Sequence, residues 1–127
     1  MKSLVTLTFI VLTAVLANAQ EFKFQSETIN YGKITQGTNG IRVFEFTNVG
    51  DAPLIIKEIK SSCGCAIPKK PERPIMPGEK GEISVSYDTA RMGGFSKAIT
   101  IYSNAKQERK SLKIKGYVTK KKQNSKV

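Results

Sequence analysis

The segment "KGEISVSYDT", residues 80–89, carries the clearest secondary-structure pattern in the sequence. Ile83, Val85 and Tyr87 alternate with polar residues, so every second side chain is apolar. Successive side chains of a β-strand point to opposite faces of a sheet. The alternation therefore predicts a strand with one buried face and one face in water.

The same pattern recurs along the chain between turn-forming residues. Pro77 and Gly78 form the clearest turn signal, because proline fixes the first central position and glycine accepts the positive φ of the second. Prolines in residues 69–77 favour an extended edge or a crossover, since proline cannot donate to a sheet, and a docking site for a partner is the alternative. Seven strands are expected, at residues 21–25, 28–34, 40–48, 52–60, 80–89, 96–103 and 109–119. Their alternating apolar positions predict a core of Phe44, Phe46, Ile83, Val85, Tyr87, Ile99, Ile101, Leu112 and Ile114.

No segment shows a sustained 3.6-residue period, so we expect an all-β fold. About seven short strands with regular turns are typical of an antiparallel β-sandwich. A small closed barrel is the alternative, because periodicity alone does not separate the two. The antibody version of the sandwich is excluded, since it needs two distant cysteines and a tryptophan, and the chain has adjacent cysteines and no tryptophan.

The N-terminal residues of the chain predict export. Lys2, an apolar run at residues 4–16 and the small residues Ala17 and Ala19 form the three parts of a secretory signal. We expect residues 1–19 to be a cleaved signal peptide, residues 20–119 a β-sandwich domain and residues 120–127 a basic, disordered tail. The protein would lie in the periplasm or outside the cell, and no later apolar stretch would span a membrane after cleavage.

The amino-acid composition excludes several kinds of catalytic and metal-binding site. The chain has a formal net charge of +11 and no histidine. A Ser-His-Asp triad, a Cys-His pair and an imidazole metal site are therefore excluded. We expect that the protein is not an enzyme and that it has no catalytic residue, no cofactor and no dedicated metal site. Few aromatic residues stand among the basic ones, which disfavours nucleic acid as a partner. The basic tail leaves an anionic surface open as a partner.

Both cysteines lie in "SSCGCAIP", residues 61–68, with Gly64 between Cys63 and Cys65. In a flat strand, residues two apart are separated by roughly 6.6 Å, too far for a disulfide, whose Cβ atoms lie about 3.5–4.5 Å apart. A turn through a positive-φ Gly64 would close the bridge. The closed loop would be very short and the bond easily reduced, which favours a redox role over a stabilising one.

Two other interpretations of the cysteine pair stay open. Two thiolates suit monovalent copper, with Met76 and Met92 as candidate additional ligands. A tight bend with two buried, inert thiols is the simplest reading, because free cysteine is among the most buried residue types.

The series formed by Asn48–Gly50, Cys63–Cys65 and Pro77–Glu79 resembles a bacterial exported family of unknown function. That family is similar to the abnormal-spindle/Hydin and major sperm protein domains, and the resemblance implies an immunoglobulin-like sandwich. It extends to Val118 and is carried by Phe44, Phe46, Asn48, Gly50, Leu54, Cys63, Gly64, Cys65, Pro68, Pro77, Gly78, Glu79, Gly94 and Gly116.

We therefore expect an exported, non-enzymatic binding or assembly module with a protein partner. The alternative is a thiol-disulfide redox or copper-handling protein that uses Cys63 and Cys65. A third hypothesis is an electrostatic binder of an anionic polymer or membrane surface.

Overall fold

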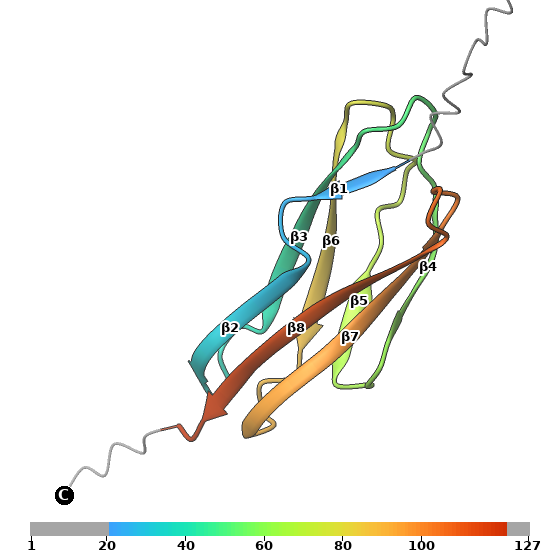
Figure 1. The fold of residues 1–127 in the computed structure, drawn as a ribbon. Coiled ribbons are helices and arrows are strands. Elements are labelled where there is room, and N and C mark those ends of the chain that lie inside the picture. Colours follow the sequence, from blue (N-terminus) through green and yellow to red (C-terminus); the bar gives the residue numbers. More distant parts are fainter. Residues whose placement is uncertain (1–20, 122–127) are drawn as a thin grey trace, which may run out of the picture.

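The computed structural model describes residues 21–121, and every regular element among them is a β-strand (Figure 1). The strands are β1 (Phe22–Phe24), β2 (Thr28–Thr35), β3 (Ile41–Asn48), β4 (Ile56–Ser61), β5 (Ala66–Lys69), β6 (Lys80–Tyr87), β7 (Gly93–Ser103) and β8 (Arg109–Thr119). Within residues 21–121, no helix is long and apolar enough to cross a membrane. The expected signal peptide and most of the expected basic tail lie outside the described residues and stay predictions.

The strands form two four-stranded sheets, in the orders β1-β3-β6-β5 and β2-β8-β7-β4. Figure 1 shows the two sheets as separate layers, with β2, β8 and β7 in front of β3 and β6. The predicted immunoglobulin-like sandwich is thus confirmed, and the closed barrel is excluded. The strand count is eight, because β5 was not expected: it has four residues, one of them Pro68, and no clear alternation.

One strand pairing is not antiparallel. The chain crosses from one sheet to the other between β1, which pairs with β3, and β2, which pairs with β8. After this crossing, β2 runs in the same direction as β8, so the two strands pair in parallel. The register shifts between Asn30 and Lys33, where Gly32 has a φ of 66°. A glycine with positive φ is typical of a bulge, which explains why β2 continues through this residue.

The core lies between the two sheets and contains every residue that the alternation predicted. Ile83, Val85, Ile99, Ile101 and Ile114 have no exposed surface. Burial of each such side chain contributes about 1.5–3 kcal/mol, so these positions account for much of the driving force for folding. The core also contains buried side chains outside the predicted set, which are Tyr31, Leu54, Ile56, Cys65, Ala66, Ile75, Phe95, Ala105 and Val118.

Asn48 joins two loops at one end of the sandwich. Its side chain is fully buried, and its Nδ2 donates to the carbonyl oxygens of Ala52 and Ile75, both at 2.8 Å. Its Oδ1 accepts from the Gly50 N–H at 3.0 Å. The Asn-x-Gly motif is therefore a structural joint between the loop after β3 and the proline-rich connection before β6.

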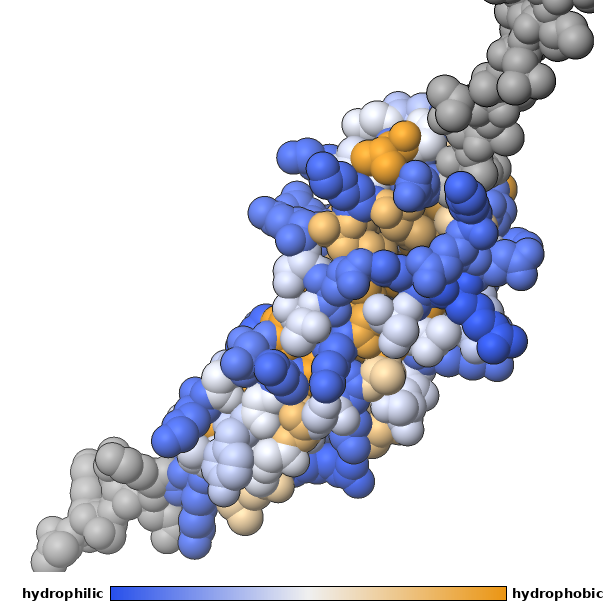
Figure 2. All heavy atoms as spheres, viewed as in Figure 1, coloured by the Kyte–Doolittle hydropathy of each residue, from blue (hydrophilic) through white to orange (hydrophobic). Residues whose placement is uncertain are grey.

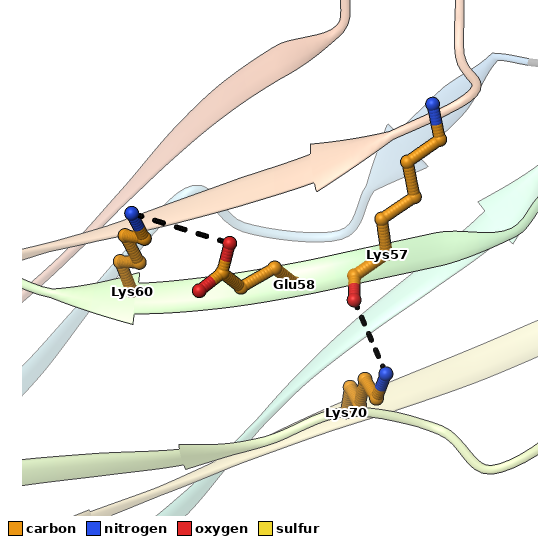
Figure 3. A network of polar contacts seen from close by, with 4 residues as sticks. All are labelled: Lys57, Glu58, Lys60 and Lys70. Atoms are coloured by element: carbon orange, nitrogen blue, oxygen red, sulfur yellow. Dashed lines mark hydrogen bonds and ion pairs between the residues drawn. The ribbon is translucent and has the colours of Figure 1, made fainter.

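The edge strands β4 and β5 lie along the same side of the sandwich and are both protected. Pro68 in β5 has no N–H to offer to another strand. Lys70 donates its Nζ to the Lys57 carbonyl oxygen of β4 at 3.2 Å, while the Lys57 side chain points the other way (Figure 3). The Lys60 Nζ lies 4.0 Å from the Glu58 Oε2, and both residues belong to β4, so the edge also carries charged side chains. These devices disfavour strand addition at this side.

Candidate functional site

The two cysteines lie in the turn that joins β4 to β5. The Ala66 N–H donates to the Cys63 carbonyl oxygen at 3.2 Å, so Gly64 and Cys65 occupy the centre of the turn. The turn brings the Cα atoms of Cys63 and Cys65 to 5.2 Å, and the structure joins the two Sγ atoms in a disulfide.

The expected conformation of Gly64 is wrong. The glycines with positive φ in the described part of the chain are Gly32, Gly37, Gly78 and Gly93. A Cβ atom built on Gly64 would meet no atom within 4 Å outside the two neighbouring residues of the chain. The turn therefore does not require glycine at its centre, because hydrogen bonds around it already determine its shape.

The Pro77–Gly78 pair adopts the conformation that the sequence predicts. Gly78 has a φ of 80°, and the Glu79 N–H donates to the Met76 carbonyl oxygen at 2.9 Å across the turn. The Gly78 N–H also donates to the Asn48 carbonyl oxygen at 2.8 Å. This turn thus belongs to the joint around Asn48, at the end of the sandwich away from the cysteines.

The two sulfur atoms have different surroundings. Cys65 is 6% exposed and belongs to the core, whereas Cys63 is half-buried at its margin. The Cys63 Sγ accepts from the Cys65 N–H at 3.0 Å and from the Arg91 Nη1 at 3.5 Å. Arg91 comes from the connection between β6 and β7, so the contact exists only in the folded chain.

An aromatic cluster lies beside this turn. The Tyr87 and Phe95 rings stack with their centroids 3.7 Å apart, and Tyr31 packs edge-on against both. Burial raises the pKa of Tyr87; the Arg91 guanidinium opposes that effect, and Asp88 adds to it. The positive charge of Arg91 therefore acts on the Tyr87 hydroxyl as well as on Cys63.

The methionines named as candidate copper ligands are not gathered around the cysteines. Met76 follows Ile75, which pairs with Leu54 ahead of β4, whereas the cysteines follow the end of β4. Met92 follows Arg91, whose Nη1 lies 3.5 Å from the Cys63 Sγ, and is 58% exposed. Within residues 21–121, no group of three or more His, Cys, Asp or Glu side chains is arranged to hold a metal ion.

The outer face of the β1-β3-β6-β5 sheet carries a second candidate site. The register places Ile41 and Ile67 on either side of Ser86. In the next outward-facing row, Val43 lies opposite Ser84. The three aliphatic side chains are 45–67% exposed, and we call these five residues the apolar patch.

Charged residues continue this face beyond the apolar patch. Glu45 lies directly opposite Glu82, one row after Val43 and Ser84. Neither glutamate belongs to an ion pair within the described chain. Opposed like charges destabilise a strand pair, and Lys23 and Lys80 in the next row of this face offset that cost only in part, since neither forms an ion pair with the glutamates.

A hollow of about 690 Å³ opens beside the patch and the glutamates. It lies between β6 and the proline-rich connection, and its lining includes Ser84, Glu82 and residues 69–76. The proline-rich residues 69–77 were one candidate docking segment in the sequence, whereas the apolar patch was not expected. The available signal was that β3 has apolar residues on both faces of the strand, with Ile41 and Val43 on one face and Phe44 and Phe46 on the other.

The outer face of the other sheet is basic. Lys113 and Lys115 of β8 are exposed there, and the register places them beside Thr28 and Asn30 of β2. Figure 2 shows this side of the molecule, and hydrophilic side chains cover most of it. The expected contact between the basic tail and an anionic surface rests largely on residues 122–127, outside the described chain, and stays a prediction.

Comparison with solved structures shows the fold alone. A protein of unknown function from Porphyromonas gingivalis W83 is 18% identical, with a TM-score of 0.71 over 84% of this chain. The chain spans 51% of that protein's length. The ASH/PapD-like domain 7 of human CEP192 is 8% identical, with a TM-score of 0.67 over 83% of this chain and 89% of the domain.

A third similar structure is a bacterial complex. The CsuC–CsuE chaperone-tip adhesion subunit pre-assembly complex of Acinetobacter baumannii gives 16% identity and a TM-score of 0.57, over 78% of this chain and 57% of the matched one. No curated protein matches the sequence. A profile of the family described as "Protein of unknown function (DUF1573)" matches residues 22–118.

Proposed function

The chain belongs to the DUF1573 family, whose description assigns no function, so we infer its role from its surfaces and propose an exported, non-enzymatic binding module. The partner is a protein, and it docks on the outer face of the β1-β3-β6-β5 sheet. The apolar patch is the observation that carries this proposal.

The patch differs from an ordinary solvated sheet face. One face of an antiparallel sheet commonly packs on the core while the other is polar. Here Ile41, Val43 and Ile67 expose 52%, 45% and 67% of their surface in two adjacent rows. Ser86 lies between Ile41 and Ile67, and Ser84 lies between Val43 and the exposed Lys69, which begins the polar rim. An exposed group of aliphatic side chains with a polar rim is typical of a protein-binding surface.

The chemistry of the partner follows from the neighbouring charges. The Glu45–Glu82 pair lies one outward-facing row beyond Val43, or roughly 7 Å along the strands. A partner with apolar side chains and a Lys or Arg about that distance away would cover the patch and neutralise the opposed carboxylates. Complementary charge mainly determines the register and specificity of such a contact.

Face-on docking is favoured over strand addition at β4 and β5, because Pro68 and the Lys70–Lys57 contact protect those edges. The Acinetobacter complex supports the proposed class of role, since there a chain of this fold forms part of a chaperone complex with a tip adhesion subunit. The partner of the present chain is expected to be another exported protein.

The test places a photo-crosslinking amino acid at Ile67 in the native host and at Val49 as a control. Val49 is also exposed, at 49%, but lies in the loop after β3. We expect the Ile67 probe to capture one protein through a segment with apolar and basic residues, and the Val49 probe not to capture it. Val43→Asp should abolish the capture, and Glu82→Lys should weaken it.

Two results would contradict the proposal. Capture that persists in Val43→Asp would show that the patch does not make the contact. Crosslinks from Ile67 to a second copy of the same chain would show that the patch is a self-association surface and not a docking site for another protein.

A further inference from the structure

We propose that the Cys63–Cys65 pair is a redox-active disulfide that exchanges with dithiols, with Cys63 as the attacked sulfur and Arg91 as the group that stabilises its thiolate. This activity is separate from the binding role and does not depend on the apolar patch. Its substrate class is a molecule with two neighbouring thiols, either a small dithiol or a reduced cysteine pair in a protein.

Access decides which sulfur reacts. An incoming thiolate must approach a disulfide sulfur from solvent. Cys63 is half-buried at the margin of the core, whereas Cys65 is 6% exposed and belongs to the core. The mixed disulfide therefore forms on Cys63, and Cys65 is the leaving sulfur.

Two positive or partly positive groups point at the Cys63 sulfur. The Arg91 Nη1 lies 3.5 Å from Sγ, and the Cys65 N–H donates to Sγ at 3.0 Å. Nearby cations and backbone N–H groups favour thiolate over thiol. Asp88 is the nearest opposing charge in the connection from β6 to β7, but its Oδ1 accepts from the Ala90 N–H at 3.0 Å within its own turn.

The side chain of Arg91 is exposed, but the backbone that carries it is fixed by hydrogen bonds. Its N–H donates to the Asp88 carbonyl oxygen at 3.2 Å. The preceding residue, Ala90, accepts from the Gln36 Nε2 at 2.9 Å. These contacts tie the connection between β6 and β7 to the loop after β2, and so keep the backbone of Arg91 beside the cysteine turn, within reach of its guanidinium.

The exchange is balanced in two steps. First, one thiolate of the dithiol bonds to the Cys63 Sγ, the Cys63–Cys65 bond breaks, and Cys65 leaves with the electron pair and takes up a proton. Second, the other thiolate attacks the substrate sulfur of the mixed disulfide and expels Cys63 as a thiolate, which Arg91 stabilises. The dithiol loses two electrons and becomes a disulfide, and the protein pair gains both. A stabilised leaving thiolate makes the second step faster and shifts the equilibrium toward oxidation of the dithiol.

The turn is built to persist in both redox states. The Ser62 N–H donates to the Ala98 carbonyl oxygen at 3.0 Å, and the Ala98 N–H donates back to the Ser62 Oγ at 3.1 Å. The Asp88 N–H donates to the Cys65 carbonyl oxygen at 2.8 Å. The disulfide closes a loop with only one intervening residue. Breaking it therefore returns little conformational entropy to the unfolded chain and costs little stability. Reduction should therefore leave the sandwich folded.

The first experiment measures thiol reactivity in the exported protein. The chain is reduced with dithiothreitol, freed of it under inert gas and treated with iodoacetamide at pH 7, and the modified peptides are quantified. We expect Cys63 to react at least tenfold faster than Cys65. Arg91→Gln should slow Cys63 by about tenfold, the effect of one unit of thiol acidity. Arg91→Lys should retain most of the rate, and Arg109→Gln, at the far end of β8, should not change it.

The second experiment tests the exchange itself. Oxidised protein is mixed with dithiothreitol and quenched with acid, so that the fraction reduced at equilibrium is read by mass. Arg91→Gln should make the disulfide harder to reduce, whereas Arg109→Gln should not. Cys65→Ser, incubated with oxidised glutathione, a linear disulfide without a second thiol to release Cys63, should accumulate a mixed disulfide on Cys63.

Two outcomes would overturn this inference. They are equal alkylation of the two cysteines, and an Arg91→Gln protein that matches Arg109→Gln in both assays. Neither outcome would affect crosslinking from Ile67, so this proposal and the binding role can fail separately.

Discussion

Replacement of Asn48 tests whether the Asn-x-Gly motif acts as a buried joint. The side chain is fully buried and makes three hydrogen bonds, as donor to Ala52 and Ile75 and as acceptor from Gly50. Asn48→Ala removes all three and leaves the Ala52 carbonyl oxygen and the Gly50 N–H without their partner, whereas the Ile75 carbonyl oxygen still accepts from the Leu54 N–H at 2.8 Å. No water is expected to replace the amide, because the site is enclosed by the two loops that it joins.

The expected cost follows from the number of lost contacts. Each hydrogen bond contributes about 1 kcal/mol net, and a buried group left unpaired costs about 1–3 kcal/mol. Three contacts therefore give a loss of about 3–4 kcal/mol in the free energy of unfolding. A domain of this size has about 5–15 kcal/mol in total, so the variant should still fold.

Urea denaturation followed by circular dichroism measures this loss. With a slope of about 1–3 kcal/mol per molar urea, the midpoint should fall by roughly 2 M. Asn39→Ala is the matched control, because the Asn39 Oδ1 also accepts a backbone N–H, from Ile41 at 2.9 Å, but is exposed to water. The control should lose about 1 kcal/mol or less.

Asn48→Asp adds a pH test of the same reasoning. The acid keeps the shape of the amide but offers at most one donor, and only when it is protonated. Its ionised form would face the carbonyl oxygens of Ala52 and Ile75, so ionisation is disfavoured in the folded state. Stability is therefore retained at acidic pH and lost as the pH rises. Two results would refute the role of Asn48 as a joint. One is a urea midpoint that falls no further for Asn48→Ala than for Asn39→Ala, and the other is a stability loss in Asn48→Asp that does not change with pH.

Two further pairs of substitutions test the sandwich and the turn. Val85→Ala should cost about 1–3 kcal/mol in urea denaturation, because it removes fully buried methyl groups, whereas Lys113→Ala on an outer face should cost little; equal losses would mean that the strand faces are misassigned. Gly40→Ala should destabilise by about 1–3 kcal/mol or more, since its Cβ would overlap the Tyr87 carbonyl oxygen, whereas Gly64→Ala should be nearly neutral; a thermal midpoint that falls more for Gly64 than for Gly40 would contradict the turn geometry.

The sequence by itself determined the features that depend on neighbouring residues. Alternation within residues 80–89 and 109–119 specified strands and their buried faces, because side-chain direction in a strand depends only on position parity. The Pro77–Gly78 turn was equally local, since both residues restrict or permit φ through their own covalent structure. These signals were sufficient for the all-β class and for the predicted core.

Tertiary structure decided what depends on partners distant in the chain. The parallel pairing of β2 with β8, and β5 as a strand, follow from which sheet each segment joins. Asn48 becomes a joint only because the proline-rich connection carries Ile75 to it. Arg91 meets Cys63 because Asp88 pairs with Cys65 across adjacent strands, and 28 residues of chain separate the two contacting side chains. Ile41, Val43 and Ile67 form one patch because β6 places its serines between them, a juxtaposition set by register and not by local pattern.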